Sequence, residues 1–219
     1  MKITSKAVVA FGMVSGLVAI NATVANAKVL EHIVFHDDTT FLGFDSSSPL
    51  DCGGFTGALS SHASLNGFEF TNKSTSNGDV RSNSAVITFF QQNGCTGDFV
   101  FGFGDIPGGF TQDGLKSGHF LGTVVLTDFG GFPLGTVAMD ITVVGTGPVS
   151  QNNQHIRSTI TTPTGPIVQT IHSNGKSVDA VISAFAFSFN GAAVPAPDSS
   201  FAQIAVTKSG TMQTEKANK

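Results

Sequence analysis

The strongest constraint on this chain is a stripe of phenylalanines in its last quarter. Between residues 178 and 189 bulky rings alternate with alanine and serine, which puts three rings on one side of an extended backbone: Phe185, Phe187 and Phe189. Successive side chains of a β-strand point to opposite faces. The pattern therefore predicts a strand with one bulky apolar face. A second stripe follows the same rule: Phe99, Phe101 and Phe103.

The two stripes have two interpretations. The favoured one makes the rings the core between two packed sheets, because a sandwich needs apolar inner faces. In the other, the same rings line the inside of a barrel and bind a small apolar ligand. A cavity walled by both stripes favours the barrel, whereas a solid core around them favours the sandwich.

Short alternating runs continue from residue 28 onward, separated by turns rich in glycine, asparagine and proline. Asn66-Gly67 predicts a hairpin turn, because both residues accept a positive φ. Residues 106–117 are rich in glycine, and we expect a solvent-crossing loop there, with a site-bearing loop as the alternative. Without helical periodicity, the chain is predicted to be all-β. We expect an antiparallel β-sandwich, with a closed or partly open antiparallel β-barrel as the alternative.

The first 27 residues have the features of a secretory signal peptide. Two lysines precede an apolar run over residues 7–20, and the segment ends in Ala-Asn-Ala. A basic start, a short apolar run and small residues at the exit are typical of an exported precursor. We therefore expect a signal peptide, 1–27, and a single all-β domain, 28–219. The protein is predicted to be bacterial and secreted or periplasmic, with no membrane span in the mature chain.

The composition argues against several classes of partner. Charged residues make up 12% of the chain, and the formal net charge is −4. Without a basic patch to neutralise phosphates, nucleic-acid binding is not expected. The chain also lacks Trp and Tyr, the aromatic residues that suit half-wet ligand sites. A glycoside hydrolase is therefore not favoured.

The chain contains two cysteines, Cys52 and Cys95. An even number of cysteines in an exported protein predicts a disulfide. Glycines close to both cysteines suit bends at strand ends. A redox or metal role is not expected, because the spacing is not that of a CxxC motif.

The best candidates for metal ligands are His32, His36 and Asp37. His32 and His36 share one face of a strand but are two strand repeats apart, so one ion needs a bend at His36. Zinc also needs three or four ligands, of which the rest must come from elsewhere in the chain. The favoured alternative places these residues on a solvated strand and turn, because their spacing matches no established ligand motif.

No catalytic residue is predicted. Ser61 and His62 are adjacent, and neighbours in a strand face opposite ways, so they do not form a serine–histidine pair. A G-x-S-x-G motif is absent from the sequence.

These observations favour a secreted, non-enzymatic binding or surface-interaction module. The partner is unspecified, a protein or a small apolar ligand being expected, and no cofactor is expected. The first alternative is a β-barrel that binds a small apolar ligand. The second is a metal-dependent secreted hydrolase, which requires His32 and His36 to converge with another histidine or a carboxylate.

Overall fold

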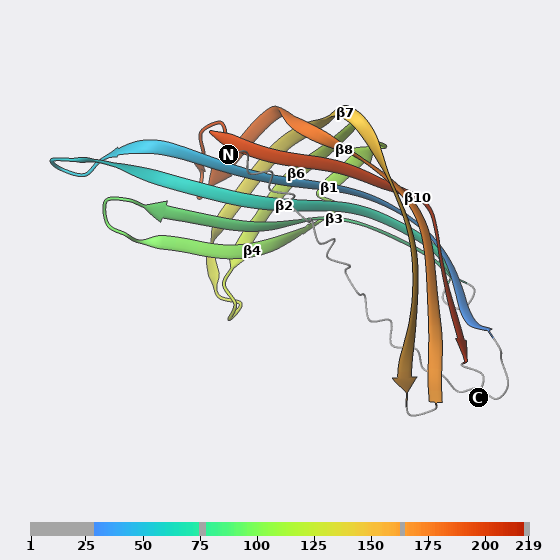
Figure 1. Ribbon diagram of the computed structural model, residues 1–219. Helices are drawn as coiled ribbons and strands as arrows, with labels where there is room; N and C mark the ends of the chain where they lie inside the picture. The colour runs from blue at the N-terminus through green and yellow to red at the C-terminus, as the bar shows by residue number, and fades with distance from the viewer. Residues whose placement is uncertain (1–28, 75–77, 163–164, 217–219) are drawn as a thin grey trace, which may run out of the picture.

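The structure is a computed structural model that describes residues 29–74, 78–162 and 165–216, most of them in β-strands (Figure 1). The strands are β1 (Val29–Asp51), β2 (Thr56–Ser74), β3 (Gly78–Asn93), β4 (Phe99–Pro107), β5 (Phe110–Asp113), β6 (Ser117–Thr127), β7 (Pro133–Thr162), β8 (Gly165–Phe189), β9 (Ala192–Ala193) and β10 (Ser199–Lys216). Among the described residues, no helix has the length and apolar character needed to cross a membrane.

The strands pair in the order β10-β1-β2-β3-β4-β6-β7-β8, and β8 pairs in turn with β10. All of these pairings are antiparallel. Because β8 pairs with β10, the sheet returns to its first strand and its hydrogen bonding forms a ring. β5 pairs with β6 and the short β9 with β8. The predicted antiparallel all-β class is therefore confirmed. The arrangement fits a β-sandwich and also a partly open barrel.

The ring has one weak junction, between β4 and β6. These strands pair only at Phe103 and Thr127, whereas the other neighbours in the ring share long ladders. Side-chain packing takes the place of hydrogen bonds there. A Cβ added at Gly104 would lie 2.7 Å from Val124 of β6. The glycines on this side of β4 thus make room for the side chains of β6.

Alternate residues of each strand point into the ring and fill it with apolar side chains. The largest fully buried ones are Phe44, Phe89, Phe110, Phe120, Leu42, Leu65, Ile87, Leu126, Ile141, Ile204, Val137 and Val143. The stripe of β8 is part of this core. Phe187 and Phe189 are buried, and Phe185 packs edge-on against Phe44, with ring centroids 5.0 Å apart. The prediction that this stripe belongs to the core is confirmed.

The other stripe, on β4, lies on the outside of the ring. Phe99 is 67% exposed, while Phe101 and Phe103 pack against Phe129, itself 85% exposed. Contrary to the favoured interpretation, these rings do not belong to the core. The reason is that β4 turns its glycines inward, where β6 packs closely, and alternation then turns its phenylalanines outward.

The glycine-rich segment 106–117 lies across one end of the ring and has buried as well as exposed residues. It contains β5, whose Phe110 is 1% exposed and lies over Gly67 of β2. Gln112 Nε2 donates a hydrogen bond to the carbonyl of Ala205 at 2.9 Å, and Thr40 Oγ1 donates to Gln112 Oε1 at 2.8 Å. The segment is therefore anchored to both β1 and β10, and we call it the plug.

The opposite end of the ring carries the turns at residues 52–55, 94–98, 128–132 and 190–198, and we call it the loop end. The segment 190–198 covers the loop end. Val194 is buried, and its N–H donates to the carbonyl of Phe187 at 2.9 Å. Ser46 Oγ donates to the carbonyl of Pro195 at 2.9 Å. Both ends of the filled ring are thus covered.

The predicted disulfide is present between Cys52 and Cys95, whose Cα atoms are 5.3 Å apart. It joins the β1–β2 turn to the β3–β4 turn. Gly57 lies beneath it, and a Cβ there would be 2.6 Å from the Cys52 sulfur. The bond therefore fixes two neighbouring turns at the loop end, with glycine providing the space.

Beyond the plug, six strands continue and bend away from the ring (Figure 1). We call this extension the arm, and it comprises residues 29–37, 69–74, 78–82, 147–162, 165–176 and 207–216. A register shift between Thr207 and Ser209 of β10 lies where the arm begins. Such bulges bend a strand and increase its twist.

Candidate functional site

The structure does not bring the three predicted metal ligands together. His32 and His36 lie on the same face of β1, roughly 13 Å apart at the rise of a β-strand. Asp37 points to the opposite face, because adjacent strand residues alternate. Within the described part of the chain, no three histidine, cysteine or acidic side chains converge as a metal site needs.

His36 and the two aspartates after it form a charged group where the arm joins the ring. His36 Nε2 lies 3.2 Å from Asp38 Oδ1. Burial, with the charge of Asp38, raises the pKa of Asp37 to about 6, although His36 acts to lower it. Burial is also the main cause that raises the pKa of Asp38. Burial therefore disfavours the ionised forms of both aspartates, and Asp37 lies on the other face of the sheet from His36 and Asp38.

The six predicted ligand-binding phenylalanines do not share a wall. Those of β8 point into the ring, whereas those of β4 point to solvent or to the 128–132 turn. The rings of β8 also have close neighbours: Phe187 lies 5.5 Å from Phe89 between ring centroids. Side chains therefore occupy the space that a small apolar ligand would need between these rings.

A hollow of about 350 Å³ lies on the outer face of the ring, across β2, β1 and β10. Its floor is Gly43 of β1, which has Phe201 of β10 as its cross-strand partner. Phe41 forms the wall beside it, and its ring centroid is 5.9 Å from that of Phe201. The two rings are 37% and 47% exposed. We call this feature the aspartate–phenylalanine hollow, after Asp45 on its other wall.

Asp45 holds the polar wall of the hollow together. Its Oδ1 accepts a hydrogen bond from His62 Nδ1 at 2.8 Å, and its Oδ2 accepts one from Ser199 Oγ at 3.0 Å. The hydrogen bond from His62, followed by that from Ser199, lowers the pKa of Asp45. Asp45 is therefore ionised at neutral pH. A carboxylate has about four lone-pair positions, so it can accept further hydrogen bonds from a ligand.

This arrangement differs from a catalytic triad. In a triad, histidine lies between the carboxylate and the nucleophile, whereas here the carboxylate lies between His62 and Ser199. The same aspartate–histidine pairing occurs elsewhere on the outer face, between His119 Nε2 and Asp140 Oδ1 at 2.8 Å. The chemistry that the hollow can perform is binding: an anionic, hydrogen-bonding wall opposite two aromatic faces.

The charges around the hollow are of one sign. The loop end carries several carboxylates: Asp45, Asp51, Asp98, Asp128 and Asp198. The lysines and arginines with described side chains lie on the arm or beside the plug: Lys73, Arg81, Lys116, Arg157 and Lys176. The described face around the hollow is thus negative and complementary to a cation.

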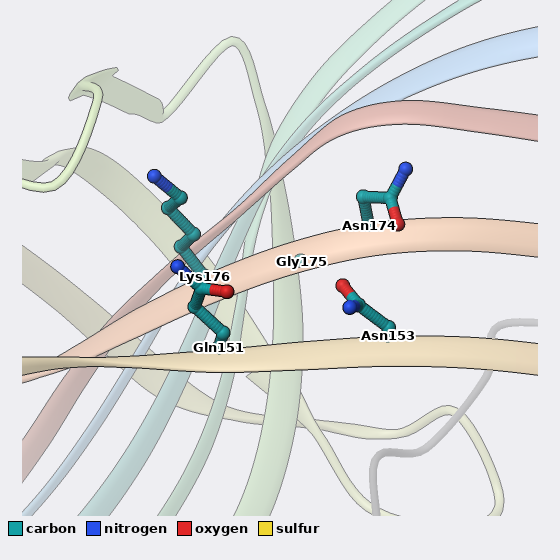
Figure 2. Close-up of a pocket in the computed structure, with 5 residues that line it drawn as sticks. All are labelled: Gln151, Asn153, Asn174, Gly175 and Lys176. Atoms are coloured by element: carbon teal, nitrogen blue, oxygen red, sulfur yellow. The ribbon is translucent and has the colours of Figure 1, made fainter.

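A second hollow, of about 290 Å³, lies on the arm between β7 and β8. Figure 2 shows its polar lining: Gln151 and Asn153 on β7, and Asn174, Gly175 and Lys176 on β8. One step further out, the rings of His155 and His172 stack with centroids 4.1 Å apart. The lining of this hollow is polar, and it lacks the aromatic walls of the first hollow.

Sequence reasoning did not identify the aspartate–phenylalanine hollow. Its members come from residues 41–45, 62 and 199–201, so only the pairing of β1 with both β2 and β10 brings them together. The local signal in the sequence is the alternation of Phe41, Gly43 and Asp45, which puts an aromatic ring, an open position and a carboxylate on one face.

No family model matches the chain, and no curated protein or solved structure is significantly similar to it.

Proposed function

We propose that the protein is an exported, non-enzymatic binding module that holds a cationic group of a partner protein in the aspartate–phenylalanine hollow. The group is a lysine or arginine side chain. One observation carries the proposal: the ionised carboxylate of Asp45 stands opposite the exposed rings of Phe41 and Phe201. A cation over an aromatic face contributes about 0.5–2 kcal/mol. Hydrogen bonds from a charged donor to a carboxylate are about twice as strong as neutral ones.

Export is part of the proposal. The predicted signal peptide, 1–27, lies outside the described residues. The disulfide between Cys52 and Cys95 supports export, because such bonds persist in oxidising compartments. The negative loop end would attract a basic partner from a distance, since complementary fields raise association rates.

The two alternatives have less support. A small apolar ligand needs space inside the ring, where the inward positions carry packed side chains. A metal-dependent hydrolase needs His32 and His36 to converge with a third ligand, and these residues stay apart along one strand.

The test is binding of an end-blocked oligolysine peptide, measured by isothermal titration calorimetry at low and at high salt. We expect binding that weakens as salt rises, because the hollow is open to solvent and its charge is screened. Asp45→Asn should weaken binding about tenfold or more, and Phe201→Ala should also weaken it.

Matched controls separate the hollow from charge in general. Asp140→Asn removes the same charge from the same kind of histidine pair on the outer face. Phe129→Ala removes an exposed ring from another surface. Both should bind oligolysine like the unaltered protein. The proposal fails if Asp45→Asn and Asp140→Asn have equal effects, or if a neutral peptide of the same length binds as tightly.

A further inference from the structure

The arm has a long unpaired edge along β7. β6 pairs with β7 only as far as Val144, opposite Ser117. β8 continues to pair with the other side of β7 as far as Thr162. Among the described strands, none pairs with the outer side of residues 150–161. The backbone N–H and C=O groups on that side can therefore accept another β-strand.

This edge lacks the features that usually protect an edge strand. Natural edges are kept apart by lysines, prolines, bulges or short length. Here the sequence from 150 to 161 contains no proline, and its single permanently charged residue is Arg157. The edge on the opposite side of the arm is formed by residues 78–82 of β3. That edge is shorter, and its Arg81 is paired with Glu69 at 2.7 Å.

The middle of the β7 edge is made of amide side chains. Gln151 and Asn153 lie on the face shown in Figure 2, and alternation places Asn152 and Gln154 on the other face. An amide both donates and accepts hydrogen bonds. The amides of one edge can thus hydrogen-bond to the amide, serine and threonine side chains on the same edge of a second copy.

We propose that two copies of this chain pair edge to edge, β7 against β7 and antiparallel, through residues 150–161. The two arms then form one continuous sheet. The contact is isologous, so it closes after two copies. It goes beyond the proposed function, because the aspartate–phenylalanine hollow takes no part in it.

Symmetry fixes which side chains meet. The two-fold axis of such a pair is perpendicular to the sheet, so each face stays on its own side. Odd-numbered residues of one β7 therefore lie opposite odd-numbered residues of the other in every register. In a register centred on Ile156, Asn153 lies opposite Thr159 and Arg157 lies opposite His155, so the two arginines do not face each other.

The test uses like and unlike charges on this face. Asn153 and Thr159 are exposed, and both are odd-numbered. One variant carries Asn153→Glu with Thr159→Glu, and a second carries Asn153→Lys with Thr159→Lys. The mass of the unaltered protein, of each variant and of their equal mixture is measured by sedimentation velocity over a wide concentration range, with circular dichroism to check folding.

We expect a dimer for the unaltered protein and a dissociation constant about tenfold higher or more for each variant alone, because like charges opposite each other destabilise strand pairs. The mixture of the two variants should restore the dimer. The control, Thr123→Glu with Ala184→Glu on the outer face of the ring, should stay dimeric. A monomeric unaltered protein overturns the proposal. A glutamate variant that dimerises as tightly as the unaltered protein also overturns it, and so does a control variant that becomes monomeric.

Discussion

The contact between Gly67 and Phe110 makes a sharp prediction about how the plug is held. Phe110 is 1% exposed, and a Cβ at residue 67 would overlap three carbons of its ring. Gly67→Ala should therefore destabilise the fold by about 1–3 kcal/mol through overpacking. Phe110→Ala should cost about 3–5 kcal/mol, the range for removing a buried ring.

The two substitutions should not be additive. Once Phe110 is alanine, the new methyl group at residue 67 has room, and Gly67→Ala loses most of its cost. It can then stabilise the strand slightly, because glycine in a strand is entropically unfavourable by about 0.5–1 kcal/mol relative to alanine. We therefore expect a coupling free energy of about 1–3 kcal/mol between the two sites, typical of residues in contact.

The assay is urea unfolding with the disulfide intact. Far-UV circular dichroism is the suitable signal, because the chain has no Trp or Tyr for fluorescence. Gly43→Ala is the matched control: its added Cβ would meet nothing closer than 3.8 Å, and we expect a change within about 0.5 kcal/mol. Additive effects at residues 67 and 110, within about 0.5 kcal/mol, would refute the placement of Phe110.

Three further predictions follow from single contacts. Replacing Cys52 and Cys95 by serine should cost about 4 kcal/mol in the loop-closure account, given their sequence separation of 43, and urea unfolding of that variant measures it. Asp37 has its pKa raised from 3.8 to about 6, so its contribution to stability is fully present below pH 3.8 and is lost as pH rises through 6. Asp37→Asn should then raise the free energy of unfolding at pH 7 by about 1–2 kcal/mol, after discounting for partial exposure, and leave it unchanged near pH 3; equal effects at both pH values would contradict this. Phe187→Ala should cost about 3–5 kcal/mol and Phe99→Ala less than about 1 kcal/mol, so similar unfolding midpoints for the two would contradict their opposite placement.

Strand alternation predicted the class of fold, because period-two patterning depends only on which residues face apolar surroundings. It did not predict which face of β4 turns inward. Both choices were open in the sequence: Phe99, Phe101 and Phe103 on one face, Gly102 and Gly104 on the other. The close approach of β6 decided between them, and that is a contact between distant parts of the chain.

The predicted turn at Asn66-Gly67 was wrong, since β2 runs straight through it. Local preference favoured a turn, but the glycine has a different role. It leaves the space that Phe110 occupies, and a residue with a side chain could not. For 106–117, the expected solvent-crossing loop contains β5, and its Phe110 is buried against Gly67, a contact between distant parts of the chain that local sequence does not reveal.

The disulfide could be predicted because it was inferred from the cysteine count and the expected compartment, neither of which depends on strand register. The aspartate–phenylalanine hollow could not, because it depends on register. Asp45 and Ser199 are 154 residues apart and meet only through the pairing of β1 with β10. A shift of one residue would turn Asp45 to the other face.

The central claim is that the ring is filled and that ligand binding takes place on its outer face, in the aspartate–phenylalanine hollow. The most direct test is a backbone amide NMR titration of the oxidised protein with the end-blocked oligolysine peptide. We predict saturable shifts at residues 41–45, 62 and 199–201, with little change at the inward residues Phe187 and Ile141. An absence of shifts at the hollow, or shifts confined to the interior of the ring, would contradict the claim.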